Sequence, residues 1–597
     1  MSGRHATTKK RKPSSTREGE AGQEPVLKST GDLRAIKDRE RERFARIARG
    51  DLPLGIFRKP CRVKILMLVD TGISYNQFYF GLSEVLDTLR ENPEWWVNFE
   101  VTRAHRQNDP NPPANGTPAY DLYGPHFENF RFDQSGFDLD DYDQVWFFGF
   151  NRGNTGALTD DELEILFRWM DNGGGVFATG DHANLGEALC SNIPRVRSMR
   201  KWRTAGVDPA PFAFGPDRHD TLRKGHDFPG TAAVDESTSY TFDDESDDVP
   251  MVIRLRWYVH HHCHGGHLHH HHLHWYWPYF TRRSPHPVLC GMDGPIRILP
   301  DHPHEGEVVV PRDLTEIASF GDYSAPEYPE VSGQPLSPEI IAWAKVQDDH
   351  SNESFKGACN AKEFGAIGAY NGHCAGVGRV IVDSTWHHWF DVNLTGRMVF
   401  SSSTPGNVET GDLRKLEGFN SSPQGQQALS RIRNYYRNVA IWLSPRNRLR
   451  CMAARGLWNA LRRYPLFADL SLDQPIWVKG HHAIDVLGKY AGQCQVYSWW
   501  PLLYPKLDIN RLMDPEVFPV PIDPLKMMDA FILGGILHAM IEIRDSGKAD
   551  RKAPNDKTLL KTAETGARAG VEALLEHIGQ SQKAHKVLAD ILKKGVK

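Results

Sequence analysis

The chain has 597 residues, of which 24% are charged, and a formal net charge of −4, so no global field directs it to nucleic acid. This length suffices for roughly three or four domains and a large core. No apolar run reaches the roughly 18 residues that a membrane span needs, so we expect no membrane contact.

Residues 1–57 are predicted to form a disordered basic arm. Fourteen Lys/Arg face seven Asp/Glu over residues 1–50, with too few apolar side chains to offset the entropy of ordering. Two interpretations stay open: a solvated tail, or a tether for an acidic partner or nucleic acid. In either case, truncation at Asp51 should leave the melting temperature unchanged.

The next segment alternates strands and helices. Near-continuous apolar runs indicate strands buried on both faces, and apolar residues at spacings of three and four indicate helices. Thr159 and Glu162 have the spacing of a capping box at the start of one helix. Strands are predicted at residues 63–69, 96–102, 144–148 and 176–179, and helices at 78–89 and from Thr159. This order predicts an α/β fold with a mainly parallel, doubly wound, flavodoxin-like sheet.

Residues 202–322 are predicted to be a long insertion, because periodicity fails there. The tract 260–274 holds ten of the chain's 28 histidines. It is either a metal-binding segment or a low-complexity loop whose replacement at 269–272 by Ser should leave stability unchanged. The shorter segment 300–305, Pro-Asp-His-Pro-His-Glu, is either a second metal site or a rigid polar turn.

The remainder contains one more buried strand, over residues 379–383, and then a helical region. A helix is predicted over Leu336–Trp343 with Ser337 as its cap. From residue 424 the pattern becomes helical. We therefore divide the chain into the arm, an α/β domain over 58–405 and a helical domain over 424–597.

The cysteine pattern bears on the compartment. Eight cysteines lie scattered without regular spacing, which does not indicate a disulfide framework and favours a reducing environment. The N-terminal residues also lack the apolar core of a secretory signal. We therefore expect a cytoplasmic protein.

Polar side chains follow each of the four predicted parallel strands. Because the carboxyl ends of parallel strands meet at one edge, these side chains should lie close together. The candidates are Asp70, Thr71, Asn151, Arg152, Asp181, His182, His387 and His388. The alternative is that they cap helices and satisfy loops.

The strand segments resemble the class I glutamine amidotransferase-like superfamily, including its ThuA-like branch. The resemblance rests on residues 63–70, on Tyr142-Asp-Gln-Val-Trp-Phe-Phe-Gly149, on Gly173-Gly-Gly-Val-Phe-Ala-Thr-Gly-Asp-His182 and on residues 378–388. It implies a flavodoxin-like sheet with a nucleophile elbow after the central strand and a later His-x-Glu. This chain has Gly180-Asp181-His182 at the elbow instead of cysteine, and no Glu follows His387 or His388 two residues on, so we do not expect glutaminase activity.

Two hypotheses follow for the function. The first is a metal-assisted or Asp/His acid–base hydrolase of a small polar substrate. Asp181 would be a metal ligand or base, and His182, His387 and His388 ligands of zinc or iron or proton shuttles, oriented by Asp383, Ser384 or Thr385. Asp70, Thr71, Asn151 and Arg152 would bind substrate, with Arg152 on an anionic group. The second hypothesis is a catalytically silent scaffold that binds a ligand or partner.

Overall fold

The computed structural model describes most of the chain outside the arm and the insertion. The described residues are 60–75, 80–91, 96–108, 125–181, 184–203, 250–258, 284–291, 294–300, 306–346, 362–395, 418–463, 467, 470–487, 502–504, 524–546 and 554–595. The basic arm, the His-rich tract 260–274, the motif residues 301–305 and His182 lie outside them. The predictions for these segments therefore stay predictions.

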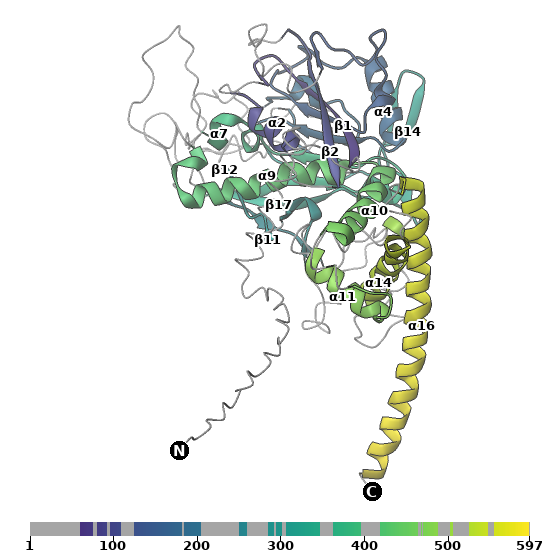
Figure 1. Ribbon diagram of the computed structural model, residues 1–597. Helices are drawn as coiled ribbons and strands as arrows, with labels where there is room; N and C mark the ends of the chain where they lie inside the picture. Colours follow the sequence, from purple (N-terminus) through teal and green to yellow (C-terminus); the bar gives the residue numbers. More distant parts are fainter. Residues whose placement is uncertain are drawn as a thin grey trace, which may run out of the picture.

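A nine-stranded sheet forms the centre of the molecule (Figure 1). In spatial order its strands are β3 (His126–Phe127), β2 (Val97–His105), β1 (Cys61–Val69), β4 (Gln144–Phe148), β5 (Gly175–Thr179), β19 (Val380–Asp383), β18 (Lys362–Tyr370), β17 (Glu339–Val346) and β7 (Arg254–Leu255). The pairs from β3 to β19 are parallel, and the three remaining pairs are antiparallel. The mainly parallel α/β sheet is thus confirmed, with all four parallel strands predicted around the site in one sheet.

Each face of the sheet has its own apolar core, because successive side chains of a strand point to opposite faces. Along β1, Ile65 and Met67 belong to one core, whereas Leu66 and Leu68 belong to the other. The first core is closed by α2 (Ser83–Arg90), α9 (Pro423–Leu443) and α10 (Arg446–Arg463), and the second by α4 (Asp160–Asp171) and the short α5 (Glu187–Cys190). The strands are therefore buried on both faces, as their near-continuous apolar runs predict.

The predicted capping box begins α4. The Thr159 hydroxyl accepts a hydrogen bond from the Glu162 N–H, and the Glu162 carboxylate accepts one from the Thr159 N–H. That carboxylate is fully buried and forms a bidentate ion pair with Arg106, which follows β2. Burial raises the pKa of Glu162, but the Arg106 guanidinium and the backbone donors outweigh it, so the pKa lies below its usual value. The pair joins the start of α4 to the end of β2.

After residue 423, all regular secondary structure in the described part of the chain is helical. The helices are α9, α10, α11 (Ile476–Leu487), α14 (Pro524–Asp545) and α16 (Asp556–Gly595). Helix α9 packs on the sheet, since its Leu429, Ile432 and Tyr436 belong to the same core as β1 and β4. Helices α11, α14 and α16 pack on one another farther from the sheet, and α16 extends well past the rest of the fold (Figure 1).

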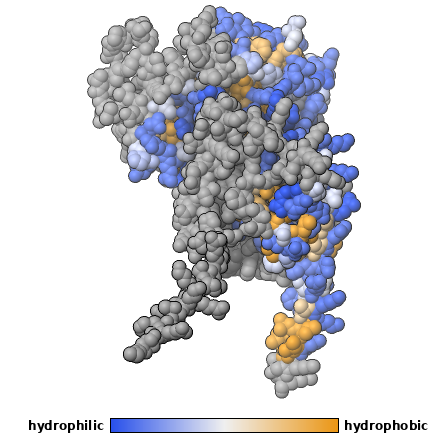
Figure 2. All heavy atoms as spheres, in the orientation of Figure 1, coloured by the Kyte–Doolittle hydropathy of each residue, from blue (hydrophilic) through white to orange (hydrophobic). Residues whose placement is uncertain are grey.

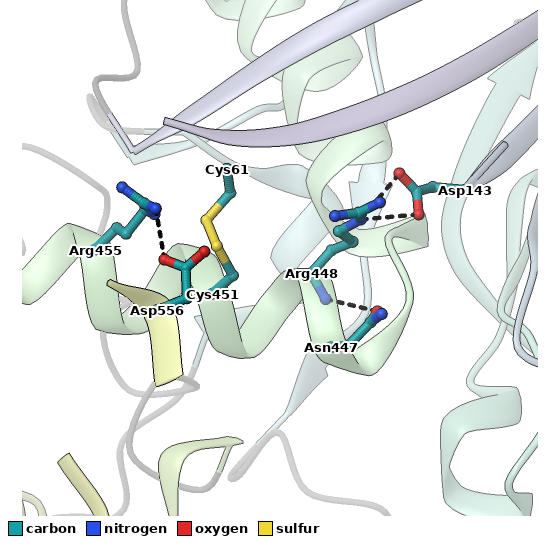
Figure 3. The surroundings of a disulfide bond; sticks show 7 residues. All are labelled: Cys61, Asp143, Asn447, Arg448, Cys451, Arg455 and Asp556. Atoms are coloured by element: carbon teal, nitrogen blue, oxygen red, sulfur yellow. Dashed lines mark hydrogen bonds and ion pairs between the residues drawn. A yellow bond between two sulfur atoms is a disulfide. The ribbon is translucent and has the colours of Figure 1, made fainter. Parts of the chain in front are cut away.

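Helix α10 is fastened to its surroundings by three side-chain links (Figure 3). A disulfide joins Cys451 to Cys61 at the start of β1. Arg448 pairs with Asp143, next to the start of β4, at 3.0 Å, and Arg455 pairs with Asp556 at the start of α16 at 2.6 Å. These links hold α10 between the sheet and the last helix.

The disulfide corrects our interpretation of the cysteines. Cys290 and Cys374 are also disulfide-bonded, and Cys190 is the free thiol among the cysteines that the structure describes. Irregular spacing misled the prediction because the bonded Cys61 and Cys451 are 390 residues apart in sequence and meet only through the fold. The argument from cysteines to a reducing compartment therefore loses its basis.

The helix predicted over Leu336–Trp343 is wrong. This segment enters strand β17, which pairs with β18 and, on its other side, with β7 from the insertion. Pairing with two neighbours outweighs the local helical pattern, and Ile341, Ala342 and Ala344 are buried as a result. The periodicity of a segment does not indicate which distant strands will pair with it in the folded sheet.

Most of the remaining strands in residues 250–335 form short antiparallel pairs. They are β6 (Pro250–Val252) with β12 (Ile298–Pro300), β8 (Trp257–Tyr258) with β9 (Ser284–Pro285), β10 (Cys290–Gly291) with β11 (Gly294–Pro295), β13 (Ile317–Phe320) with β14 (Tyr323–Pro326), and β15 (Glu330–Val331) with β16 (Gln334–Pro335). Among the described residues, no helix combines the length and apolar character needed to cross a bilayer.

Candidate functional site

The carboxyl ends of β1, β4, β5 and β19 lie side by side at one edge of the sheet, in that order. Three glycines from this edge meet backbone to backbone. A Cβ on Gly149 would lie 2.6 Å from the Gly186 Cα, and a Cβ on Gly180 would lie 2.4 Å from the Leu185 carbonyl oxygen. Gly186 has φ +92°, a conformation that favours glycine, whereas Gly180 is required by close contact. The glycines bring the turn after β5 against the end of β4.

Asp181, directly after this turn, faces His387. The Asp181 Oδ2 lies 3.4 Å from the His387 Nε2, and both side chains are almost fully buried, at 0% and 3% exposure. The Thr385 hydroxyl donates to Asp181 Oδ1 at 2.7 Å and accepts the His387 N–H at 3.0 Å as the cap of a 3₁₀ turn, Trp386–His388. Thr385 therefore sets the positions of both members of the pair, which agrees with the expected orienting role of this segment.

The second ring nitrogen of His387 is also held. Its Nδ1 lies 2.8 Å from the Asn393 Oδ1, on helix α7 (Asp391–Thr395). If Nδ1 donates to this oxygen, a neutral imidazole turns its Nε2 lone pair toward Asp181. If the amide is turned, Nδ1 accepts and a neutral Nε2–H faces Asp181. The tautomer of His387 therefore follows the orientation of the Asn393 amide.

His388 belongs to a different network. Its Nδ1 lies 2.7 Å from Asp383 Oδ1, and Asp383 Oδ2 accepts from Trp389 Nε1 and from the Tyr435 hydroxyl of α9, at 2.9 and 2.7 Å. His388 is fully buried. Burial and the Asp383 carboxylate raise the pKa of Tyr435 well above its usual value, which keeps the phenol protonated as a donor. This network fastens α9 to the end of β19.

Asp70, directly after β1, is buried, and only one of its two carboxylate oxygens accepts hydrogen bonds from the described residues. Its Oδ2 accepts from the N–H groups of Phe150 and Asn151 at 2.9 and 3.1 Å. Neither Asp70 Oδ1 nor the neighbouring Thr71 Oγ1 has a hydrogen-bond partner among the described residues, although both atoms are buried. Burial raises the pKa of Asp70 to about 7, against the opposing effect of the backbone donors and of Arg106. This carboxyl group therefore exchanges a proton near neutral pH.

The other two predicted substrate-binding residues lie on the loop after β4. Asn151 contributes its backbone N–H to Asp70, and its side-chain amide lies 3.4 Å from the Thr155 carbonyl oxygen. Arg152 is exposed. At this edge of the sheet, the side chains of Asp181 and His387 face each other. Asp70 accepts a hydrogen bond from the backbone of Asn151, and the His388 ring contacts the Asp383 carboxylate and not Asp181.

Sequence reasoning missed two residues of this site. Asn393 lies six residues beyond His387, in an Asn-Leu-Thr sequence that does not predict a contact with an imidazole. Arg200, from the start of the insertion, is fully buried against the Trp202 ring and donates to the backbone carbonyl oxygens of Asp181 and Ser384. Its guanidinium joins the ends of β5 and β19. A fully buried arginine has no sequence signal in a segment without periodicity.

Cys190, the cysteine nearest to the elbow in sequence, lies beneath it. Its sulfur is 3.7 Å from the Thr179 carbonyl oxygen and fully buried. Burial and the Asp70 carboxylate raise the pKa of this thiol well above its usual value. A thiol that stays protonated is a poor nucleophile.

No three His, Cys, Asp or Glu side chains come together to hold a metal ion within the described residues. The described part contributes Asp181 and His387, whereas catalytic zinc sites use three protein ligands. Gly306, which follows the 300–305 motif, donates its N–H to the Ser384 carbonyl oxygen at 3.2 Å.

Comparison with family models, curated proteins and solved structures finds no match to this chain.

Proposed function

We propose that this chain is an amidotransferase-like-fold hydrolase that acts on a small polar substrate by Asp/His acid–base catalysis. The observation that carries the proposal is the contact between Asp181 and His387, with Thr385 and Asn393 holding the outer atoms of both groups. A carboxylate that faces an imidazole is an arrangement found in general bases. The 3.4 Å separation is longer than a hydrogen bond, as is common before substrate binds.

In this proposal His387 Nδ1 leaves Asn393 when substrate binds, accepts the proton of an attacking water and returns it to the leaving group, while Asp181 stabilises the imidazolium at Nε2. Asp70 is the second acid–base group, because its pKa of about 7 lets it donate and accept near neutral pH. Arg152 pairs with an anionic substrate group, since its guanidinium matches carboxylate or phosphate. His182 and His388 assist as proton shuttles.

A metal-assisted form of the same hypothesis places zinc or iron on Asp181 and His387, with His182 as a further ligand, whereas His388 is held by Asp383 and does not join them. The described residues supply two adjacent donors, Asp181 and His387, whereas a catalytic zinc site uses three protein ligands. Metal content of the full-length protein and of protein lacking residues 260–274 separates the alternatives. Metal retained after the deletion supports the strand-edge site, and metal lost entirely assigns it to the tract.

The rival hypothesis, a catalytically silent scaffold, is favoured by one observation. Asp181, His387 and His388 are buried to within a few per cent, so no solvent-exposed surface of these groups meets a substrate in this structure. In the scaffold hypothesis the two Asp–His pairs hold the sheet edge to α7 and α9. The helical region and the basic arm would then make contacts with a ligand, an acidic partner or nucleic acid.

Turnover of a panel of small esters, amides and phosphate esters tests the proposal. Asp181→Asn and His387→Gln should each lower kcat by about 10²-fold or more, because general acid–base catalysis contributes roughly this factor. Asp143→Asn is the matched control, since Asp143 is a buried carboxylate near the opposite end of the same strands. Equal turnover in the two site variants and the control, with all three folded, would contradict the enzyme hypothesis.

The compartment is a separate part of the proposal. The cytoplasmic location stays a prediction, whereas disulfides form and persist mainly in oxidising compartments. Fractionation of cells, with rapid alkylation of thiols on lysis, decides between a cytoplasmic location and an oxidising compartment. Cys451 in its reduced form in a cytoplasmic fraction supports the first prediction, and an oxidised Cys61–Cys451 pair outside that fraction contradicts it.

A further inference from the structure

The C-terminal part of α16 presents an apolar face that nothing in the described structure covers. Its first half packs on α14, whereas all described side chains from residue 582 to 593 are exposed. This part of the helix extends away from the rest of the fold (Figure 1), and Figure 2 shows apolar residues gathered toward its end. Val587, Leu588, Ile591 and Leu592 are each 50–60% exposed. Such a segment is marginal as a helix by itself in water, so a covering surface is expected.

The apolar side chains share one face. Ala584, Val587, Leu588, Ile591 and Leu592 recur at spacings of three and four residues and span an arc of roughly 140° at 3.6 residues per turn. This arc is wider than the narrow a/d seam of a coiled coil. It is also short, roughly 12 Å along the helix axis from Ala584 to Leu592. A broad, short apolar face fits an extended flat surface, such as that of a membrane, better than it fits a single partner helix in a coiled coil.

The charges beside this face have one dominant sign. Residues 582–594 contain four lysines and one acidic residue, Asp590. On the helix, Lys586 and Lys593 lie on the side opposite the apolar arc and Lys583 lies at its flank, and all three are exposed. Lysine is depleted in protein–protein interfaces, whereas it is typical of helices that lie on anionic membranes.

We propose that the segment Gln582–Lys593 of α16 is a peripheral attachment helix that binds the surface of an anionic lipid membrane. The aliphatic side chains enter the boundary between headgroups and acyl chains, and the lysines stay at the level of the anionic headgroups. This attachment involves no spanning helix, and it would replace our expectation of no membrane contact. It is independent of the Asp181–His387 chemistry, since α16 contributes no residue to that site.

Flotation of the full-length protein with lipid vesicles tests the proposal. Binding is compared on vesicles of phosphatidylcholine alone and on vesicles with about 30% phosphatidylserine. We expect binding to the anionic vesicles only, falling as salt rises. Val587→Ser with Ile591→Ser should lower binding at least tenfold, and Lys586→Glu with Lys593→Glu should lower it by a similar factor.

The control is Gln580→Ser, an exposed polar position on the same helix before the proposed segment, which should bind as the wild type does. None of these side chains is buried, so the melting temperatures should agree among all variants. Three outcomes overturn the proposal. They are no binding to anionic vesicles, binding by the Val587→Ser/Ile591→Ser variant equal to that of the wild type, or a concentration-dependent dimer that this variant abolishes. The last outcome would assign the face to a second copy of the chain.

Discussion

Buried carboxylates that keep a proton near neutral pH are a recurring feature at the residue scale. Asp70 and Asp391 are both fully buried, and burial raises the pKa of each to about 7 in spite of several donors. Asp391 accepts from the N–H groups of Ser83 and Glu84 and from the Ser83 hydroxyl, so it caps α2 from a distant part of the chain. Two such groups make the fold sensitive to pH.

The sign of this sensitivity follows from the direction of the pKa shift. Between about pH 4 and pH 7 an unfolded chain has released the proton of Asp70, while the folded chain still holds it. Because the folded state binds more protons in this window, stability falls as pH rises from 4 to 7 and is constant above. Each carboxyl contributes at most about 4 kcal/mol to the fall.

We therefore predict that Asp70→Asn flattens the dependence of unfolding free energy on pH between 4 and 7. The amide keeps an oxygen for the Phe150 and Asn151 N–H groups and carries no charge to bury. Urea denaturation at a series of pH values measures the slope. Because Asp391 acts in the same window, part of the slope should persist until Asp391→Asn is added. Parallel curves for the wild type and Asp70→Asn would contradict the assignment.

Close helix packing on glycine is the feature that matters at the element scale. Helices α14 and α16 cross where Gly535 meets Gly566 and Gly570. A Cβ on Gly566 would lie 2.5 Å from the Gly535 carbonyl oxygen and 2.7 Å from the Ile536 Cα. These are backbone atoms that cannot rotate away, so one methyl group at residue 566 must push the helices apart.

Gly566→Ala is therefore predicted to destabilise the protein by roughly 1–3 kcal/mol, the usual cost of overpacking. The matched control is Gly579→Ala in the same helix, where a Cβ meets nothing within 4 Å. That change should be neutral or stabilise by up to about 1 kcal/mol, because alanine is the better helix former. Thermal unfolding of the two variants measures the difference. Equal melting temperatures would show that α14 and α16 do not cross at these glycines.

The disulfide between Cys61 and Cys451 acts on the whole molecule, because it closes most of the chain into one loop. It joins the first strand of the sheet to α10, and α10 in turn pairs with α16 through Arg455 (Figure 3). The first strand and the C-terminal helices are therefore coupled in unfolding. A long loop is also where a cross-link restricts the unfolded chain most.

Cys451→Ala is predicted to lower the free energy of unfolding by about 2–5 kcal/mol, the usual range for loss of a native disulfide. Adding Cys61→Ala should lower it little further, because both substitutions break the same bond. Denaturation in guanidinium without reductant gives the values, and non-reduced peptide mapping confirms the bond in the wild type. Additive losses in the double variant would mean that the two cysteines are not joined.

The sequence by itself determined the parallel part of the sheet. Residues 63–69, 144–148, 176–179 and 379–383 are apolar on both faces, so each was recognisable locally as a strand buried between two layers. The rule that parallel strands share a carboxyl edge then placed Asp181 near His387 before any coordinates. The capping box at Thr159 was equally local, since its two residues are three apart.

Tertiary structure alone decided the rest. Which imidazole meets Asp181 depends on the Thr385 cap, on Asn393 and on the Asp383–Tyr435 network that takes His388 away from Asp181. The Cys61–Cys451 bond and the conversion of residues 339–346 into a strand depend on partners far along the chain. Hydrophobic periodicity records burial of a segment, but it does not record the identity of the neighbour. Long-range pairing therefore had to come from the fold.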